Sequence, residues 1–305
     1  MTLQQLRYIV AIAEAGTLSG AAKELFVSQP SLTKMVRELE REMGIQIFER
    51  TNKGVNLSRE GEIFLGYARQ VLEQADLLET RYKKTAGGKQ EFTVSTQHYS
   101  FAVNAFVDLI KQHGGDSYDF SLQETQTFKI IDDVAHMRSE IGILYYNEFN
   151  QAVLQKLFKA NDLEFQELFV ARPHVFLNAS HPLAGRQTVT MEDLAPYPYL
   201  SYIQGEHNAF YFSEEIFSTM IRSKNIRVTD RATLFNLLIG LNGYTVCSGV
   251  IDRKLNGESI IAVPLAEEGT MHIGTLTHKQ VHLSRLGRAY MQALERYIAK
   301  VVAEE

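Results

Sequence analysis

Tryptophan is absent from this sequence of 305 residues, proline occurs six times and cysteine once. A single cysteine, Cys247, excludes an intramolecular disulfide and a zinc site built from several thiolates. Within the run YTVCSG this thiol is expected to be a small buried apolar group, as free cysteines commonly are. A redox role without a resolving partner is the alternative.

Long apolar runs are also lacking. No stretch reaches the roughly 18 apolar residues that a membrane-spanning helix needs. The N-terminal run MTLQQLRYIV has neither the basic start nor the small-residue cleavage site of a signal peptide. We therefore expect a cytoplasmic protein without membrane contact. The composition is that of a globular protein, and the length predicts two or three folded units.

Compact catalytic motifs are missing as well, since none of GxSxG, HExxH, GxxxxGK[ST] or GxGxxG occurs. His278 and His282 have a spacing that suits a metal on a helix, but no third ligand is evident nearby. We expect no enzymatic activity, no metal and no other cofactor. Two alternatives stay open: a catalytic site assembled in space from distant residues, and a ligand-binding or scaffold protein that does not bind DNA.

Positive charge is scarce over the whole chain, whose net charge is −5. Residues 1–84, however, hold 12 basic against 11 acidic residues, and the remainder holds 19 against 25. The negative balance therefore lies in the C-terminal part. Contact with nucleic-acid phosphates needs a local basic cluster on one surface and not a basic chain.

The N-terminal region contains three successive helical patterns. The first ends at Gly16 and has an apolar stripe at helical spacing, Leu3, Leu6, Val10 and Ala13. Thr17 or Ser19 can cap the second, which has a small apolar side, Ala21, Ala22 and Leu25. Ser28 can cap the third, with Pro30 in the first turn, where a missing N–H costs little.

The third helix is two-sided. Four apolar residues at helical spacing predict a buried face, Leu32, Met35, Val36 and Leu39. A second set, displaced by two residues, points the opposite way, Pro30, Thr33, Lys34 and Arg37. With Gln29 beside them, these groups can contact base edges in a major groove and neutralise the flanking phosphates. An ordinary solvated helix face is the alternative interpretation.

The segment RTNKGVNLS after the third helix predicts a two-stranded wing. Arg50 and Lys53 flank its tip at residues 52–54. A basic tip of this kind reaches phosphate or the minor groove next to a recognition helix. The wing and the preceding helix pair favour a DNA-binding domain over a solvated helix.

The stretch LSGAAKELFVSQPSLTKMVRELEREMGIQIFERTNKGVNLSREGEIFL closely resembles the DNA-binding domain of LysR-type transcriptional regulators. The shared features are the Ala-Ala pair, the Ser-Gln-Pro-Ser start of the recognition helix, Leu-Glu before a Gly-containing turn, Phe-x-Arg entering the wing and Ser-x-x-Gly starting the linker helix. The resemblance implies a winged helix-turn-helix whose DNA-contacting residues are Gln29, Pro30, Ser31, Thr33, Lys34, Arg37, Arg50 and Lys53. To these we add the candidate capping hydroxyls of Thr17, Ser19 and Ser28.

Two positions depart from the commonest pattern of the family. Thr33 stands where serine is usual, and Lys34 where arginine is frequent. Lysine cannot make the bidentate contact of arginine to guanine, so the base preference at this position is open.

A long helix is predicted from Ser58 to Lys84, before the breaker Gly87-Gly88. Its apolar residues recur as a heptad seam, Phe64, Ala68, Val71, Ala75, Leu78 and Tyr82. We expect a homodimer through this seam, which would place two recognition helices on a pseudo-palindromic operator in double-stranded DNA. Packing on its own domain is the alternative. The resemblance further implies a tetramer.

From Phe92 onward, short β-rich runs alternate with helical patterns, which predicts βαβ units and a parallel sheet. A helix is expected around Glu214 to Ser223. This order resembles the effector domain of the LysR family, which is similar to periplasmic binding proteins. The fold class is therefore α/β, with an all-α winged helix-turn-helix and linker helix in front. The expected domains are 1–58 (DNA-binding), 59–88 (linker) and 89–305 (effector), the last with subdomain I at 89–160 and 269–305 and subdomain II at 161–268.

Ligands of such folds bind in the cleft at the carboxyl ends of strands. Strand-to-helix junctions rich in hydroxyl and amide groups, with two positions added by the resemblance, give the candidate effector-binding residues: Ser95, Thr96, Gln97, His98, Ser100, Gln126, Thr127, Phe128, Ser201, Tyr202, Asp230 and Thr233. Simple helix capping is the alternative for each. A small polar metabolite is expected, and an anion would suit free N–H groups. Its binding would change the angle between the subdomains and so the promoter activity, with RNA polymerase as a candidate further partner.

Overall fold

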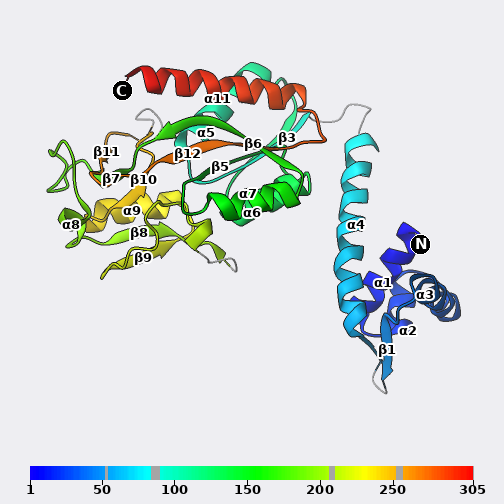
Figure 1. The fold of residues 1–305 in the computed structure, drawn as a ribbon. Coiled ribbons are helices and arrows are strands. Elements are labelled where there is room, and N and C mark those ends of the chain that lie inside the picture. The colour runs from blue at the N-terminus through cyan, green and yellow to red at the C-terminus, as the bar shows by residue number, and fades with distance from the viewer. Residues whose placement is uncertain (52–53, 84–89, 206–209, 252–256, 305) are drawn as a thin grey trace. The chain divides into compact units, whose positions relative to one another are not determined.

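The computed structural model describes residues 1–51, 54–83, 90–205, 210–251 and 257–304. The chain forms two compact units, Met1–Gly88 and Lys89–Glu305, each of which is described by itself (Figure 1). Across these described ranges, none of the helices combines the length and apolar character needed to span a bilayer.

The N-terminal unit is a winged helix-turn-helix followed by a long helix. Its elements are α1 (Leu3–Ala15), α2 (Leu18–Glu24), α3 (Gln29–Met43), β1 (Phe48–Thr51), β2 (Gly54–Leu57) and α4 (Arg59–Lys83). The helix ends match the predicted capping residues: α1 ends at Gly16 with a φ of 66°, and Ser28 caps α3. Thr17, and not Ser19, caps α2 by accepting the Gly20 N–H.

The apolar face of α3 supplies the core of this unit. Leu32, Val36 and Leu39 are buried, and Met35 packs against them from the edge. They meet the apolar side of α1 and the small pair Ala21 and Ala22 of α2, whose short side chains let the helices approach closely. The predicted two-sidedness of α3 is confirmed.

The long helix α4 packs along α1, which corrects the predicted seam. Ala68 is only 2% exposed and is therefore not available to another chain, whereas Phe64 is partly buried and packs against the core of the unit. Arg7 pairs with Asp76 at 2.9 Å, one of the ion pairs that fasten α1 to α4. The apolar residues of α4 that stay exposed are Ile63 (52%), Tyr67 (66%), Val71 (42%) and Leu78 (60%).

This exposed stripe contains two members of the predicted seam, Val71 and Leu78, together with Ile63 and Tyr67, while the seam members Phe64 and Ala75 are half-buried. The heptad pattern could not separate the two faces, because both carry apolar residues at helical spacing. The side chain of Tyr82 lies outside the described residues.

The C-terminal unit contains a five-stranded mixed sheet in the order β4-β3-β5-β12-β6. Its strands are β3 (Gln90–Thr96), β4 (Tyr118–Glu124), β5 (Ile141–Tyr146), β6 (Leu163–Ala171) and β12 (Met271–His278). The helices are α5 (Ser100–His113) and α11 (Arg285–Glu304) on one face, and α6 (Thr127–Ala135) and α7 (Gln151–Ala160) on the other (Figure 1). Within this sheet β3, β4 and β5 are parallel to one another, whereas β12 runs antiparallel to both of its neighbours. The prediction of a wholly parallel sheet is therefore wrong.

A second layer is built on smaller sheets in the orders β10-β7-β11 and β8-β9. Its elements are β7 (His174–Asn178), α8 (Met191–Leu194), β8 (Tyr199–Tyr202), η2 (Phe210–Phe212), β9 (Asn225–Val228), α9 (Arg231–Leu241), β10 (Thr245–Cys247) and β11 (Ile260–Pro264). The chain passes between the layers at residues 172–173 and 265–270, where the Leu265 N–H donates to the Pro173 carbonyl at 3.0 Å. Strand β6, expected in subdomain II, pairs with β12 in the larger sheet.

The helix expected around Glu214 to Ser223 is not formed. Residues 213–220 make turns, with Phe217 at a φ of 63°. Both glutamates of this segment are buried, and their carboxylates bind backbone N–H groups of other elements. These tertiary contacts outweigh the local helical pattern, and the correction matters for the site described below.

Gly61 offers a test of how closely α4 approaches the wing. A Cβ at this position would lie 2.1 Å from the Ile47 carbonyl oxygen, whereas Gly66 on the same helix has open space. We expect Gly61→Ala to destabilise the N-terminal unit by roughly 1–3 kcal/mol through overpacking. Gly66→Ala should stabilise it by about 0.5–1 kcal/mol through helix propensity. Thermal unfolding followed by circular dichroism measures both, and equal behaviour of the two variants would contradict the packing described.

Candidate nucleic-acid interface and effector cleft

The outward face of α3 presents polar and charged groups to solvent. Gln29, Pro30, Ser31, Lys34 and Arg37 are exposed. No ion pair of Arg37 within 4 Å occurs among the described residues. Lys34 lies 3.8 Å from Glu38, a surface pair of little energy that a phosphate could replace. Both cations are therefore available to an anionic partner.

Two hydroxyls of α3 are engaged locally. Thr33 is half-buried, and its Oγ1 donates to the Gln29 carbonyl at 2.9 Å. Ser28 Oγ accepts the Ser31 N–H at 3.3 Å as the helix cap. Ser28 and the exposed Ser19 lie on the same unit as the charged face, while the capping Thr17 is half-buried. The hydroxyls of Thr17, Ser28 and Thr33 make hydrogen bonds to backbone groups. Their contact with DNA, and that of Ser19, stays a prediction.

The wing and the residue before it are held to the helical part of the unit by three hydrogen bonds that their backbone N–H groups donate. Glu40 of α3 accepts the N–H groups of Ile47 and Phe48 at 2.8 and 3.1 Å. Val55 donates to the carbonyl of Gly16 at 2.9 Å. Gly54 is required here, because a Cβ would lie 2.3 Å from that same carbonyl oxygen.

Strands β1 and β2 pair antiparallel up to Thr51 and Gly54, with Arg50 opposite Val55. Lys53 and the side chain of Arg50 lie outside the described residues, so their predicted contacts stay predictions. The recognition helix and the base of the wing are nevertheless fixed relative to each other.

In the C-terminal unit, several candidate effector-binding residues are interior structural groups. Ser95 is fully buried and bonds Asp133 at 3.1 Å and Ser139 at 2.7 Å. Thr96 is also fully buried, and its Oγ1 donates to the Gln97 carbonyl at 2.7 Å. The prediction that these two hydroxyls face the cleft was therefore wrong, because their hydrogen bonds are made inside the protein.

Gln97 is fully buried, and its side-chain amide is hydrogen-bonded to other groups of the protein. Its Nε2 donates to Thr127 Oγ1 at 2.6 Å, and its Oε1 accepts the Tyr145 N–H at 3.1 Å and the Tyr99 hydroxyl at 3.0 Å. Both ends of the Gln97 amide are thus engaged. The residue joins β3 to α6 and β5 and sets the positions of the strand ends around the cleft.

Two of the three helix N-termini expected to attract an anion are occupied by side chains of the protein, whereas Tyr99 at the start of α5 makes no side-chain capping bond. Gln204 Oε1 accepts the Thr127 N–H at the start of α6 at 3.0 Å. Asp230 caps α9 by accepting the Thr233 N–H at 2.8 Å, and both residues are exposed. At α6 and α9 these are the capping roles named as the alternative.

The other candidates are placed as follows. Gln126 precedes α6 without a side-chain capping bond, and Phe128 packs edge-on against Phe212. Ser201 is half-buried in β8, and Ser100 Oγ lies 3.5 Å from the Val250 carbonyl. Of the twelve predicted residues, those that line one common cavity are His98, Ser100 and Tyr202.

His98 forms a buried ion pair with Glu214. Its Nδ1 lies 2.8 Å from Glu214 Oε2, and the two side chains are 5% and 6% exposed. The imidazole also stacks on Tyr202 with ring centroids 3.7 Å apart. Burial alone would lower the pKa of His98, but the Glu214 carboxylate outweighs it and raises that pKa. The Glu214 carboxylate thus favours the charged form of His98.

Glu215, the next residue, has no such cation. Its Oε1 accepts the Tyr202 N–H at 2.8 Å, and across the described residues no basic side chain lies within 4 Å of the carboxylate. Burial, together with the neighbouring Glu214, raises the pKa of Glu215 to about 8. Glu124 at the end of β4 likewise has a pKa raised by burial, although Arg231 lies 2.9 Å away.

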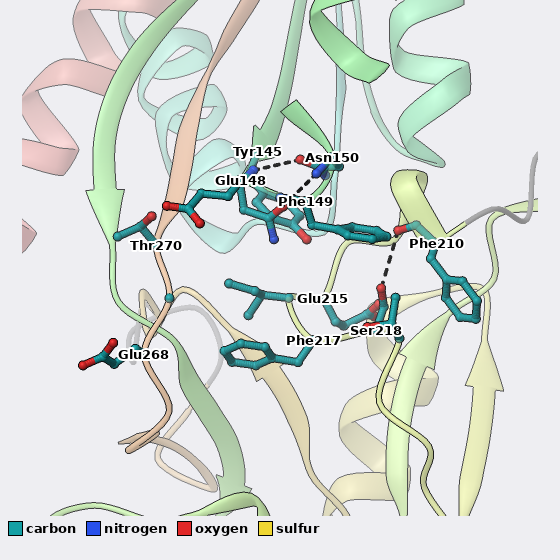
Figure 2. A pocket seen from close by; sticks show the side chains of 14 residues that line it. Tyr145, Glu148, Phe149, Asn150, Phe210, Glu215, Phe217, Ser218, Glu268 and Thr270 are labelled. Carbon is teal, nitrogen blue, oxygen red and sulfur yellow. Dashed lines mark hydrogen bonds between the residues drawn. The ribbon is translucent and has the colours of Figure 1, made fainter. Parts of the chain in front are cut away.

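Two cavities adjoin this acidic pair. The smaller, about 40 Å³, is lined by His98, Tyr202, Arg231 and Cys247 among others. The larger, about 540 Å³, lies between the β5–α7 loop, residues 210–219 and the start of β12 (Figure 2). Its lining residues are Tyr145, Asn147, Glu148, Phe149, Asn150, Phe210, Glu215, Ile216, Phe217, Ser218, Thr219, Glu268, Gly269 and Thr270.

The sequence reasoning missed this larger cavity entirely. A run of polar and aromatic residues after the strand IGILYY, and the adjacent glutamates in an aromatic stretch, were the available signals. Neither was read as a site, because the second segment was expected to be a helix. Cys247 is half-buried, and burial raises the pKa of its thiol to about 12. Within the described part of the chain, no group of three or more metal-ligating side chains occurs.

Family models match both units. The bacterial regulatory helix-turn-helix protein model of the lysR family covers residues 3–62, and the LysR substrate binding domain model covers residues 93–299. Because the second alone spans more than half of the chain, this protein belongs to the LysR family. The predicted fold class is confirmed by these matches and by the observed architecture.

Curated relatives are transcriptional regulators by name. TfdT of Cupriavidus pinatubonensis is 43% identical over 89 residues, which cover 29% of this chain and 39% of that protein. AlsR of Bacillus subtilis is 24% identical over 245 residues, covering 79% of this chain and 77% of AlsR. The chain spans two fifths or less of the length of the first relatives it matches.

Solved structures of the family share the fold over nearly the whole chain. CbnR in complex with its target DNA superposes with a TM-score of 0.59 at 18% identity, covering 97% of this chain and 100% of CbnR. A full-length OxyR variant of Pseudomonas aeruginosa gives a TM-score of 0.52 at 21% identity, covering 98% of this chain and 94% of OxyR. At these identities the likeness concerns the fold alone.

Glu215 generates a prediction about stability and pH. The folded protein keeps a proton on this carboxyl up to about pH 8, whereas an ordinary glutamate loses it near 4.5. Raising the pH from 5 to 8 therefore favours the unfolded chain, and Glu215 costs increasing stability across that window. Glu215→Gln should raise Tm more at pH 8 than at pH 5. Glu164→Gln, an exposed control on β6, should shift Tm equally at both; the same equality in Glu215→Gln would contradict the assignment.

Proposed function

We propose that this protein is a sequence-specific DNA-binding transcriptional regulator, and not an enzyme, whose activity a small molecule in the C-terminal unit modulates. The observation that carries the proposal is the two-sided α3, with a buried apolar face and exposed Lys34 and Arg37 beside an anchored wing. Membership of a family whose named relatives are regulators supports it. We place the protein in the cytoplasm, where regulators of this bacterial family meet DNA.

The DNA-contacting surface we propose combines the exposed groups of α3 with the wing. Gln29 and Ser31 are placed near the N-terminus of α3, where recognition helices read base edges. Lys34 and Arg37 supply the charge for phosphates or guanine. Thr17, Ser19, Ser28, Pro30, Thr33, Arg50 and Lys53 complete the proposed surface.

The self-interaction we propose uses the exposed stripe of α4, defined as Ile63, Tyr67, Val71 and Leu78. An apolar row of this length on a solvated helix is stabilised by burial against another copy. A dimer so formed presents two recognition helices to a pseudo-palindromic operator. Further assembly to a tetramer and contact with RNA polymerase belong to the same proposal.

The C-terminal unit supplies the effector site in this proposal. The larger cavity is lined by Glu268, Gly269 and Thr270, which belong to one of the two places where the chain passes between its sheet layers. A ligand bound there would change the angle between the layers and, through the linker helix, the spacing of the recognition helices. The division into residues 1–58, 59–88 and 89–305 is retained as part of the proposal, with β6 moved to the larger sheet.

The recognition face is tested by removing its charges. We expect Arg37→Ala and Lys34→Ala each to weaken binding at least tenfold, in line with roughly 1–3 kcal/mol for a base contact. DNA fragments are first selected from a random pool by the wild-type protein, and affinity is then measured by gel shift at several salt concentrations. Lys156→Ala, an exposed lysine of α7, serves as the control. Undiminished binding by both α3 variants would refute the proposed face.

The dimer is tested on the exposed stripe of α4. Leu78→Glu and Tyr67→Glu place a charge in the proposed interface, so we expect the dimer dissociation constant to rise at least tenfold in sedimentation equilibrium. Glu62→Lys changes a charge on the same helix outside the stripe and should leave association unchanged. If the stripe variants associate as the wild type does, another surface joins the subunits.

A further inference from the structure

The larger cavity of the C-terminal unit has a strongly biased lining. Three of its residues are acidic, namely Glu148, Glu215 and Glu268, and none is lysine, arginine or histidine. No ion pair within 4 Å involves any of the three across the residues that the structure describes. The volume of about 540 Å³ lies in the range of small-molecule sites.

Aromatic rings form much of the remaining wall. The aromatic lining residues are Tyr145, Phe149, Phe210 and Phe217, of which Phe210 turns its ring away from the other lining side chains (Figure 2). Phe149 and Phe210 are 48% and 57% exposed, an unfavourable state that a ligand would relieve. The faces of such rings carry negative potential and attract cations that have shed water. The aromatic rings and the carboxylates of the cavity therefore both favour a positively charged ligand.

Glu214 and Glu215 are adjacent in the sequence, but only Glu215 lines the larger cavity. Glu214 turns to His98, which compensates its charge. Glu215 is 3% exposed, lines the cavity and accepts a hydrogen bond from the Tyr202 N–H. A buried carboxylate without a cation is costly, and a bound cation would remove that cost.

The polar amides at the mouth do not compete for this role. Asn147 Oδ1 accepts the N–H groups of Phe149 and Asn150, and Asn150 Oδ1 accepts the Asn147 N–H at 2.8 Å. The β5–α7 loop is thus closed on itself and presents the Glu148 carboxylate and the Phe149 ring at the cavity.

We propose that the effector of this regulator is a cation with an apolar body, such as an aliphatic amine, whose ammonium group binds near Glu215 and whose chain lies against the aromatic rings. This inference rests on the proposed function and specifies the ligand class of its effector site. It replaces the anionic metabolite suggested by the sequence, since the carboxylates of Glu148 and Glu268 repel an anion.

The proton on Glu215 provides an independent signature. The buried carboxyl has its pKa raised to about 8, so it is largely protonated at pH 7. An ammonium ion beside it favours the ionised form, and binding releases that proton to solvent. The charged and titratable groups that interact electrostatically with Glu215 are Glu214, Arg222 and the hydroxyls of Tyr99, Tyr145, Tyr199 and Tyr202.

The test uses three probes of equal chain length on the full-length protein: hexylamine, hexanol and hexanoate. Isothermal titration calorimetry at pH 7 should show hexylamine binding at least tenfold more tightly than hexanol, with hexanoate weakest. Titration in phosphate and in Tris should reveal proton release with hexylamine only. Glu215→Gln should reduce hexylamine to the level of hexanol and abolish proton release, while the exposed control Glu164→Gln should change neither.

Hexanoate binding as tightly as hexylamine, equal binding of hexylamine and hexanol, or binding of none of the three would each overturn the cation proposal. Loss of hexylamine affinity in Glu215→Gln through misfolding is detected by circular dichroism, whose spectrum for the variant should match that of the wild type. DNA affinity of the same preparation is measured in parallel. Intact DNA binding with a failed probe series rejects only the ligand class, whereas absent DNA binding rejects the proposed function.

Discussion

The buried pair of His98 and Glu214 organises the C-terminal unit. It joins the β3–α5 junction to a segment 116 residues later in the chain, and the stacked Tyr202 ring draws β8 into the same contact. Removing one partner from such a pair leaves an uncompensated charge in a dry environment, which costs far more than a surface pair gains. The pairing also determines which of two adjacent carboxylates is compensated and which meets the larger cavity.

The N-terminal unit shows how far local sequence rules reach. Apolar spacing gave the buried face of α3, and Ser28, Gly16 and Thr17 marked helix ends correctly, because capping depends on residues within a few positions. The packing partner of the α4 seam was harder to predict. Ala68 has the same spacing as a dimer residue and as a residue packed on α1, and only the tertiary structure separates these two outcomes.

Local sequence rules predicted little of the site in the C-terminal unit. Ser95, Thr96 and Gln97 follow a strand as ligand-binding residues do, yet their hydrogen bonds close inside the protein. The helical pattern around Glu214 was overridden by contacts to backbone groups of residues distant in sequence. In this chain the hydroxyl-rich junctions mark the ends of strands. The charge of the cleft depends on side chains that distant segments of the sequence contribute.

The thiol chemistry of this chain has a practical consequence. Cys247 is half-buried in β10 with a thiol pKa of about 12, so very little reactive thiolate exists at neutral pH. A cysteine introduced on an exposed position would react with maleimide labels in preference to it, with no need to replace the native residue. Spin or fluorescent probes attached to α4 and to α11 would then report the distance between the two units directly.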